Sequence, residues 1–155
     1  MRIEIISIGK IKERSLRTLC ENYSKRIRYY SPIDIVEVKE EKIQDKRRTI
    51  DILKREAVRL HRVVRPDIAV GLDIKGRRFS SEELAEFLMR RRSQGQKELQ
   101  FIIGGPLGLA PEVLDRCAVR WSLSKLTFPH ELARVLVLEQ IYRAFTILRG
   151  ESYHK

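Results

Sequence analysis

The hydrophobic and polar positions of this 155-residue chain form two alternating kinds of pattern. Short runs rich in Ile, Val and Leu end at Gly or Pro, which is typical of β-strands. Longer segments repeat apolar residues every three or four positions, which is typical of amphipathic helices. The pattern predicts strands at residues 2–9, 33–38, 67–73, 99–105 and 120–124. It predicts helices at residues 13–30, 45–64, 81–93, 111–117 and 129–149.

This strict alternation of strand and helix indicates an α/β fold with a mainly parallel sheet and helices on both faces. The run Leu99–Gly105 is apolar throughout, so its strand is expected to be covered on both sides. No repeat, low-complexity tract or linker divides the chain. We therefore expect residues 1–155 to form a single domain.

The predicted last helix carries more apolar surface than one contact with a sheet requires. One stripe consists of Ala133, Val137, Ile141, Ala144 and Leu148. A second group, partly around the other side, consists of Leu132, Val135, Leu136 and Tyr142. A helix that is apolar on two sides is usually buried on two sides. Other elements of the same chain could cover the second side, and so could a second subunit; we expect the second subunit.

The charge balance narrows the classes of partner. The chain has 32 Lys and Arg against 21 Asp and Glu, a net charge of +11. This surplus favours a polyanion such as nucleic acid, although solvated helix faces would also account for it. Cys20 and Cys117 are distant in sequence, which suggests reduced thiols. No signal-peptide pattern and no apolar run of membrane-spanning length is present, so we expect a soluble cytoplasmic protein without a membrane partner.

Ligands of parallel sheets bind beyond the carboxyl ends of the strands, which directs attention to three stretches. They are "GLDIKGRRFS", "IIGGPLGL" and "SLSKLTFPH". Gly71 and Gly76 have the spacing of a phosphate-binding loop, but Arg77 and Arg78 replace its Lys and Ser or Thr. The glycines of the second stretch do not form GxGxxG. Nucleotide hydrolases and NAD-dependent dehydrogenases are therefore disfavoured.

Other candidate groups remain ambiguous from sequence alone. Three scattered histidines and two distant cysteines do not suggest a metal site. The basic runs Lys46–Arg48 and Arg90–Arg92 suit solvated helix faces or phosphate contacts. The terminal "GESYHK" could fray, or it could hold an RNA base through its aromatic ring and cations.

Four motifs nevertheless carry a family resemblance. They are "LDIKGRRFSSEELA", "FIIGGPLGL", "SLSKLTFPHELARVLVLEQIYRA" and "GESYHK". Together they resemble the RlmH family, SPOUT-class methyltransferases that modify N3 of a pseudouridine in 23S ribosomal RNA. The resemblance covers essentially the whole chain. It implies a SPOUT-type α/β fold with a C-terminal trefoil knot, S-adenosylmethionine as cofactor, a homodimer, and 23S rRNA or the ribosome as substrate.

The resemblance also implies site residues. By motif position, the cofactor contacts fall at Leu72, Gly104, Leu123, Ser124, Lys125, Leu126, Thr127 and Phe128. The groups expected to position or deprotonate the base, or to support the RNA or the tail, are His154, Tyr153, His130, Arg134 and Arg143. No metal is implied. Methylation at a ribose 2′-O or guanine N1 position stays open, as does a non-catalytic rRNA-binding assembly factor.

Overall fold

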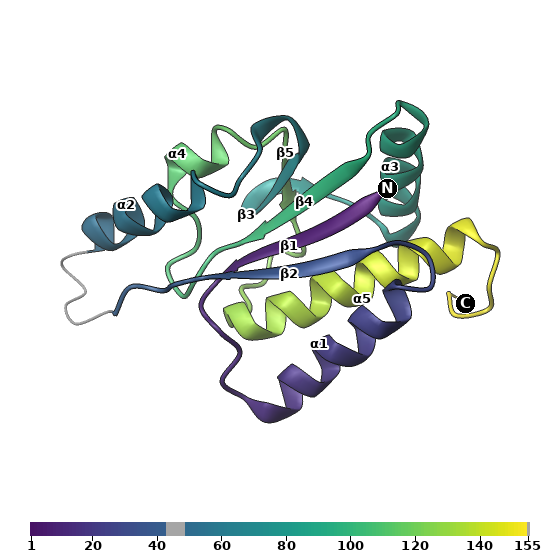
Figure 1. Ribbon diagram of the computed structural model, residues 1–155, viewed down its shortest axis with the longest axis horizontal. Helices are drawn as coiled ribbons and strands as arrows, with labels where there is room; N and C mark the ends of the chain where they lie inside the picture. Colours follow the sequence, from purple (N-terminus) through teal and green to yellow (C-terminus); the bar gives the residue numbers. More distant parts are fainter. Residues whose placement is uncertain (43–48, 155) are drawn as a thin grey trace.

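A computed structural model describes residues 1–42 and 49–154 of the chain, with strands and helices in alternation (Figure 1). The strands are β1 (Arg2–Ile8), β2 (Ile33–Val38), β3 (Ala69–Arg78), β4 (Glu98–Ile103) and β5 (Val119–Ser122). The helices are α1 (Arg14–Ile27), α2 (Thr49–Leu60), α3 (Ser81–Ser93), α4 (Pro111–Leu114) and α5 (His130–Leu148), with a short 3₁₀ turn η2 (Pro66–Ile68) before β3.

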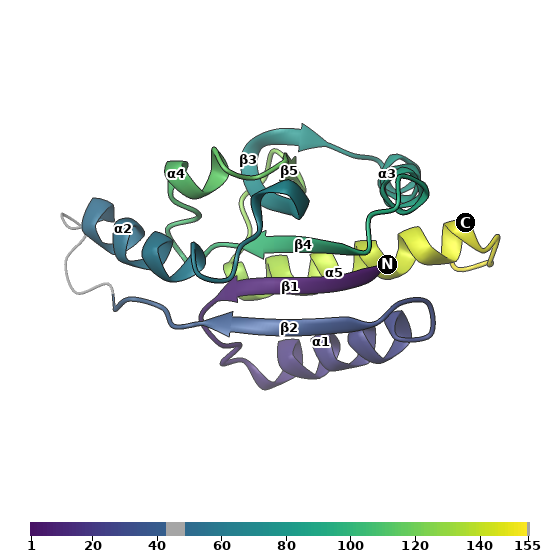
Figure 2. The ribbon, with the colours of Figure 1, turned by 45° about the horizontal axis from the view of Figure 1, so that its top comes forward.

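The strands form one sheet in the order β2-β1-β4-β3-β5, and every neighbouring pair is parallel. Helices α1, α3 and α5 cover one face, and α2 and α4 cover the other (Figure 2). The predicted α/β class is therefore confirmed, and the sheet is wholly parallel. None of the described helices is long and apolar enough to cross a membrane.

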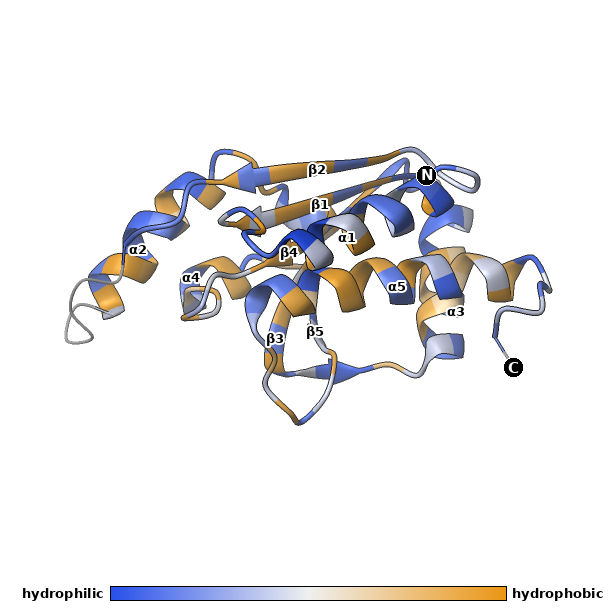
Figure 3. Cartoon of the chain, turned by 90° about the horizontal axis from the view of Figure 1, so that it is seen from below, coloured by the Kyte–Doolittle hydropathy of each residue, from blue (hydrophilic) through white to orange (hydrophobic). Residues whose placement is uncertain are grey.

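The core follows from the side-chain alternation of the strands. In β1, Ile3 and Ile5 join the core beneath α5, whereas Ile6 and Ile8 join the core beneath α2. All of these isoleucines are fully buried, and each contributes roughly 1.5–3 kcal/mol of hydrophobic stabilisation. Figure 3 shows apolar residues concentrated on the strands and along α5. The sheet is thus packed on both faces, which fixes the points where the loops after its strands begin.

Strand β3 departs from the prediction, which ended it at Asp73. It continues to Arg78 and pairs with β5 twice, with a register shift between Leu72 and Arg77. A Cβ at Gly76 would lie 2.7 Å from the carbonyl carbon of Arg120, so the glycine lets the two backbones approach closely. The prediction was wrong because Gly76, within a polar stretch, resembles a strand terminator.

The remaining differences lie at element boundaries. The predicted start of the second helix and the basic run Lys46–Arg48 lie outside the described residues. Helix α4 ends at Leu114 rather than Cys117, and β5 ends at Ser122 rather than Ser124. Helix α5 begins at His130, with Pro129 at its N-cap. Residues 123–129 therefore form the whole connection from β5 to α5.

Candidate active site

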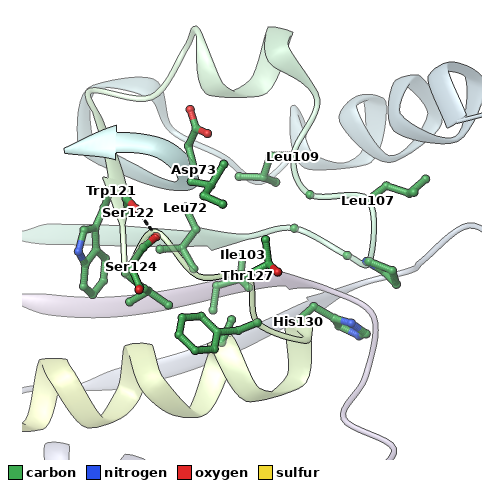
Figure 4. Close-up of a pocket in the computed structure, with 18 of the residues that line it drawn as sticks. Leu72, Asp73, Ile103, Leu107, Leu109, Trp121, Ser122, Ser124, Thr127 and His130 are labelled. Carbon is green, nitrogen blue, oxygen red and sulfur yellow. Dashed lines mark hydrogen bonds between the residues drawn. The ribbon is translucent and has the colours of Figure 1, made fainter. Parts of the chain in front are cut away.

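A cavity of about 430 Å³ lies at the carboxyl-terminal edge of the sheet (Figure 4). Three segments supply most of its lining: residues 72–74 in the middle of β3, residues 103–109 from the end of β4 onward, and residues 121–130 around the β5–α5 connection, apart from Lys125 and Pro129. The volume falls in the range of sites for small molecules and cofactors. The structure thus brings the three stretches singled out in the sequence into one place.

The cavity is mainly apolar, with few polar side chains. Leu72, Ile103 and Leu109 line it together with the polar Ser124 and Thr127 (Figure 4). All the expected cofactor contacts except one belong to its lining: Leu72, Gly104, Leu123, Ser124, Leu126, Thr127 and Phe128. The exception is Lys125, whose side chain is exposed. A flat apolar ligand with a few hydrogen-bonding groups suits such a lining.

Local hydrogen bonds fix the loop from Ser122 to Leu126. The Ser122 hydroxyl donates to the backbone oxygen of Ser124 at 2.9 Å. The backbone N–H of Leu126 donates to the Ser124 hydroxyl at 3.1 Å. Serine side chains that bond to nearby backbone favour such irregular turns over helix or strand. The two serines therefore set the shape of the cavity wall, while Leu123 and Leu126 give it an apolar surface.

The loop after β4 is shaped by its glycines. A Cβ added at Gly104 would lie 2.3 Å from the backbone carbonyl carbon of Gly108, so only glycine fits there. Gly108 has a φ of +79°, a conformation that glycine adopts readily. Its N–H donates to the carbonyl of Gly105 at 2.9 Å, which closes the turn. Gly104 therefore lets the backbone of the loop fold close against itself.

The first turn of α5 links the cavity to the β1–α1 connection. His130 lines the cavity at the end opposite Trp121 (Figure 4). Its Nε2 is buried and has no hydrogen-bond partner among the described residues. The next residue, Glu131, accepts hydrogen bonds from the backbone N–H groups of Lys12 and Glu13, at 3.0 and 3.1 Å. The cavity wall and the start of α1 are therefore held by the same helical turn.

Arg134 lies one turn further along and is only 2% exposed. Its Nη1 pairs with Glu37 at 2.7 Å, and its Nη2 donates to the carbonyl of Gly9 at 2.8 Å. The guanidinium therefore joins α5 to the ends of β1 and β2.

The C-terminal tail folds back onto α5. The Tyr153 hydroxyl donates to Glu139 at 3.2 Å. The Arg143 side chain lies 3.4 Å from Nδ1 of His154, and the other ring nitrogen of His154 lies 2.8 Å from Glu82 at the start of α3. Arg143 also pairs with Glu139 and lies over the Tyr153 ring, 4.7 Å from its centre. The tail is thus ordered by charged side chains of two helices.

The tail environment changes the proton affinity of its groups. Burial raises the pKa of Tyr153, and the hydrogen bond with Tyr23 raises it further, so the phenol stays protonated at neutral pH. The pKa of Glu82 falls to about 2, because its own backbone N–H, the Ser80 hydroxyl and His154 donate to the carboxylate. Tyr153 is consequently a hydrogen-bond donor here, and Glu82 is an anion.

The cavity borders the N-terminal end of α5 at His130, whereas the tail follows the C-terminal end of the helix and contacts Arg143. His130 begins the helix at the cavity, and Arg143, which contacts the tail, follows thirteen residues later. At 1.5 Å of rise per residue, this spacing corresponds to about 20 Å. A single chain therefore does not bring His154 to its own cavity.

The match with a protein family decides the identity of the fold. Residues 1–154 match the family model described as predicted SPOUT methyltransferase. The chain belongs to the SPOUT methyltransferase family. Within it, "Ribosomal RNA large subunit methyltransferase H" of Clostridium botulinum (strain Loch Maree / Type A3) is 43% identical, over the full length of both chains. The protein of the same name from Carboxydothermus hydrogenoformans is 42% identical, again over both full lengths.

A solved structure has a similar fold. It is a probable methylase family protein from Haemophilus influenzae Rd KW20, with a TM-score of 0.53. The superposition covers 96% of this chain and 66% of that one, at 16% sequence identity. At that identity the likeness shows the shared fold alone.

Several residues around this SPOUT site were not singled out from the sequence. Glu139 stands four residues before Arg143, a spacing that predicts an ion pair on a helix and could have revealed it. Glu82 contacts His154 across 72 residues, and no sequence signal indicates that contact. Ile103 and Leu109 flank the glycine loop and could have been included with Gly104.

Proposed function

We propose that this protein transfers a methyl group from S-adenosylmethionine to N3 of a pseudouridine in 23S ribosomal RNA, in the cytoplasm. The observation that carries the proposal is the full-length identity of 42–43% to proteins named ribosomal RNA large subunit methyltransferase H. The apolar cavity and the net charge of +11 agree with it, because the first suits a cofactor and the second suits an RNA partner.

The cavity fits the cofactor in its chemistry. We assign Leu72, Gly104 and the loop Leu123–Phe128 to it, because their apolar side chains and backbone hydrogen-bonding groups would suit a flat adenine ring with polar edges. Because Lys125 points to solvent, we assign the recognition at that position to its backbone. S-adenosylmethionine supplies a methyl group already activated on a sulfonium sulfur, so the chain has to bind and align rather than form a covalent intermediate.

The family membership also supports a homodimer and a trefoil knot near the C-terminus. Two observations favour the dimer. Leu132, Leu136 and Tyr142 of α5 remain only half-buried in one chain. The tail lies about 20 Å along α5 from its own cavity, so we assign the tail of one subunit to the cavity of the other. One α5 then serves two sites, one at each end.

The roles of the tail residues follow from their hydrogen bonds. N3 of the base must lose a proton as it accepts the methyl group. Tyr153 stays protonated, so we assign it to hold the base by donation rather than to take the proton. We assign proton acceptance to Nδ1 of His154, which Arg143 contacts here. The hydrogen bond with Glu139 raises the pKa of Arg143, so its lasting positive charge would stabilise the anionic base.

His130 and Arg134 receive supporting roles. His130 borders the cavity with a buried, unpartnered Nε2, so we assign it to position the RNA or the partner's tail. Arg134 is fixed to Glu37 and Gly9, so it supports the site by anchoring α5.

The decisive experiment is a methylation assay in vitro. Purified protein and labelled S-adenosylmethionine are incubated with 23S rRNA, 50S subunits or 70S ribosomes, and the modified nucleoside is located by mass spectrometry. The proposal predicts label on N3 of a pseudouridine. Label on a ribose 2′-oxygen or on guanine N1 would indicate another SPOUT specificity. Cofactor-independent RNA binding without label would indicate an assembly factor.

Removal of the tail separates binding from catalysis. A variant ending at Gly150 lacks Tyr153 and His154 but retains the cavity. It should bind S-adenosylmethionine with unchanged affinity by calorimetry and lose methyl transfer by at least 100-fold, the scale of general acid–base catalysis. Unchanged turnover would remove the tail from the mechanism.

A further inference from the structure

The C-terminal end of α1 presents an exposed cluster of cations around one tyrosine. Lys25, Arg26 and Arg28 are exposed, and the Tyr29 side chain is 92% exposed. We call these residues the α1-end patch. Such exposure is unusual for tyrosine, which normally buries most of its ring. A ring fully open to solvent beside three cations therefore requires an explanation other than packing.

The charges of the patch are not neutralised within the chain. Arg2, Arg65 and Arg120 each have an acidic partner. By contrast, across residues 1–42 and 49–154, no ion pair within 4.0 Å includes a cation of the α1-end patch. The nearest acidic residue on the helix, Glu21, forms no such pair either. These cations are thus available to an anionic partner.

The backbone at the end of α1 places the ring of Tyr29 and the guanidinium of Arg26 on the same side of the turn. The N–H of Tyr29 donates to the carbonyl of Arg26 at 3.2 Å, which is the bond of a 3₁₀ turn. Residues three apart in such a turn lie above one another. Arg26 in turn lies over the rings of Tyr23 and Tyr142, at 5.8 and 5.6 Å. Arg26 is therefore held by packing, whereas Lys25, Arg28 and Tyr29 face solvent.

Hydrogen bonds and ring contacts place the α1-end patch next to the C-terminal tail. The Tyr30 hydroxyl donates to Glu151 at 2.7 Å. The ring of Tyr142, against which Arg26 packs, lies 4.8 Å from the ring of Tyr153. A molecule bound at the α1-end patch would consequently reach the tail residues assigned above to the base.

We propose that the α1-end patch binds a single-stranded segment of the RNA substrate, next to the nucleotide that is methylated. Tyr29 stacks on a base, and Lys25 and Arg28 contact the flanking phosphates; this inference rests on the proposed rRNA function. Proteins hold single strands by this combination of aromatic stacking and cations. A second copy of the chain fits less well, because a two-fold contact centred on the patch would place these cations against one another. An anionic membrane surface would also use cations beside a tyrosine, and binding to phosphatidylserine vesicles tests that alternative.

The test compares three variants with the wild type. Tyr29→Ala removes the ring, Tyr29→Phe keeps it without the hydroxyl, and Lys25→Ala/Arg28→Ala removes the solvent-facing cations. Lys54→Ala, an exposed cation on α2 across the sheet, is the control. The probe is a single-stranded RNA oligonucleotide with the rRNA sequence around the target, measured by fluorescence anisotropy at several salt concentrations. Circular dichroism checks the fold, calorimetry checks the cofactor affinity, and sedimentation checks the oligomeric state.

We expect Tyr29→Ala to weaken RNA binding roughly tenfold or more, and Tyr29→Phe to bind as the wild type. The affinity for RNA falls with salt, and this dependence should be weaker in the double variant. The slope of log K (the association constant) against log salt should become shallower by about 1.4, or about 0.7 for each lost phosphate contact. Tyr29→Ala and the double variant should each raise KM for the RNA without changing the Kd of the cofactor. Lys54→Ala should change none of these values.

Two results would separate the failure of this inference from that of the proposed function. Wild-type rRNA methylation with unchanged RNA affinity in the Tyr29→Ala and double variants would overturn the patch and leave the function standing. Patch-dependent RNA binding without any methyl transfer to rRNA would overturn the function and support the patch. Dissociation of a dimer in the variants, or patch-dependent binding to phosphatidylserine vesicles instead of RNA, would also overturn the patch.

Discussion

Gly104→Ala tests the placement of the cofactor in the cavity. The new Cβ would lie 2.3 Å from the carbonyl carbon and 2.5 Å from the oxygen of Gly108, and 2.7 Å from the backbone nitrogen of Leu109. Carbon atoms in contact prefer about 3.5–4.0 Å, so the loop must open by roughly 1 Å. All three neighbours are backbone atoms, and no side-chain rotation relieves the clash.

The magnitude follows from the cost of overpacking, which is typically about 1–3 kcal/mol. If the loop opens to relieve this strain, the cavity wall moves with it, because residues 103–109 line the cavity. Recovering the bound geometry would then cost a similar energy. Cofactor affinity should therefore fall by roughly 5- to 150-fold.

The assay is calorimetric titration of S-adenosylmethionine, with thermal unfolding followed in parallel. Gly95→Ala is the matched control: Gly95 has a φ of +80° and nothing within 4 Å of the added Cβ. That change should cost stability of about 1–2 kcal/mol through backbone strain alone, far from the cavity. A Gly104→Ala protein that binds the cofactor as the wild type does, or no more weakly than Gly95→Ala, would refute the placement.

Two buried charges give further predictions. Burial raises the pKa of Glu56 above its ordinary value, so its ionisation opposes folding as the pH rises through the folded-state pKa. Glu56→Gln should thus raise Tm at pH 7 and have no such effect below pH 4.5; an equal gain at both pH values in calorimetric scans would contradict this. Arg134→Ala leaves Glu37 and the Gly9 carbonyl without their partner, which should cost about 3 kcal/mol and lower Tm by roughly 10 °C. An unchanged unfolding curve in urea would argue against the structural role.

The alternation of strands and helices could be predicted because it depends on local pattern. The Ile positions of β1 and the apolar run of β4 both lie where the pattern put them. The extension of β3 past Asp73 could not be predicted, because it depends on pairing with β5 across about 45 residues. A glycine that permits close approach and a glycine that ends a strand have the same appearance in sequence.

The loops that line the cavity could be predicted from the sequence, whereas the long-range ion pairs of the charged site residues could not. The motifs placed Leu72, Gly104 and the β5–α5 connection together, and these segments do line one cavity. The burial of Arg134 was not foreseen, because arginine is rarely buried without a specific partner and its partner Glu37 is 97 residues away.

The order of strands in the sheet bears on how the chain is made. The N-terminal strand β1 sits between β2 and β4, and its partner β4 comes about 100 residues later. During synthesis, the edge of β1 that pairs with β4 stays unpaired until most of the polypeptide has left the ribosome. That strand is rich in isoleucine. Parallel pairing over such separations is intrinsically slow. A nascent chain stalled before residue 98 should therefore be a strong client of chaperones that shield exposed strands.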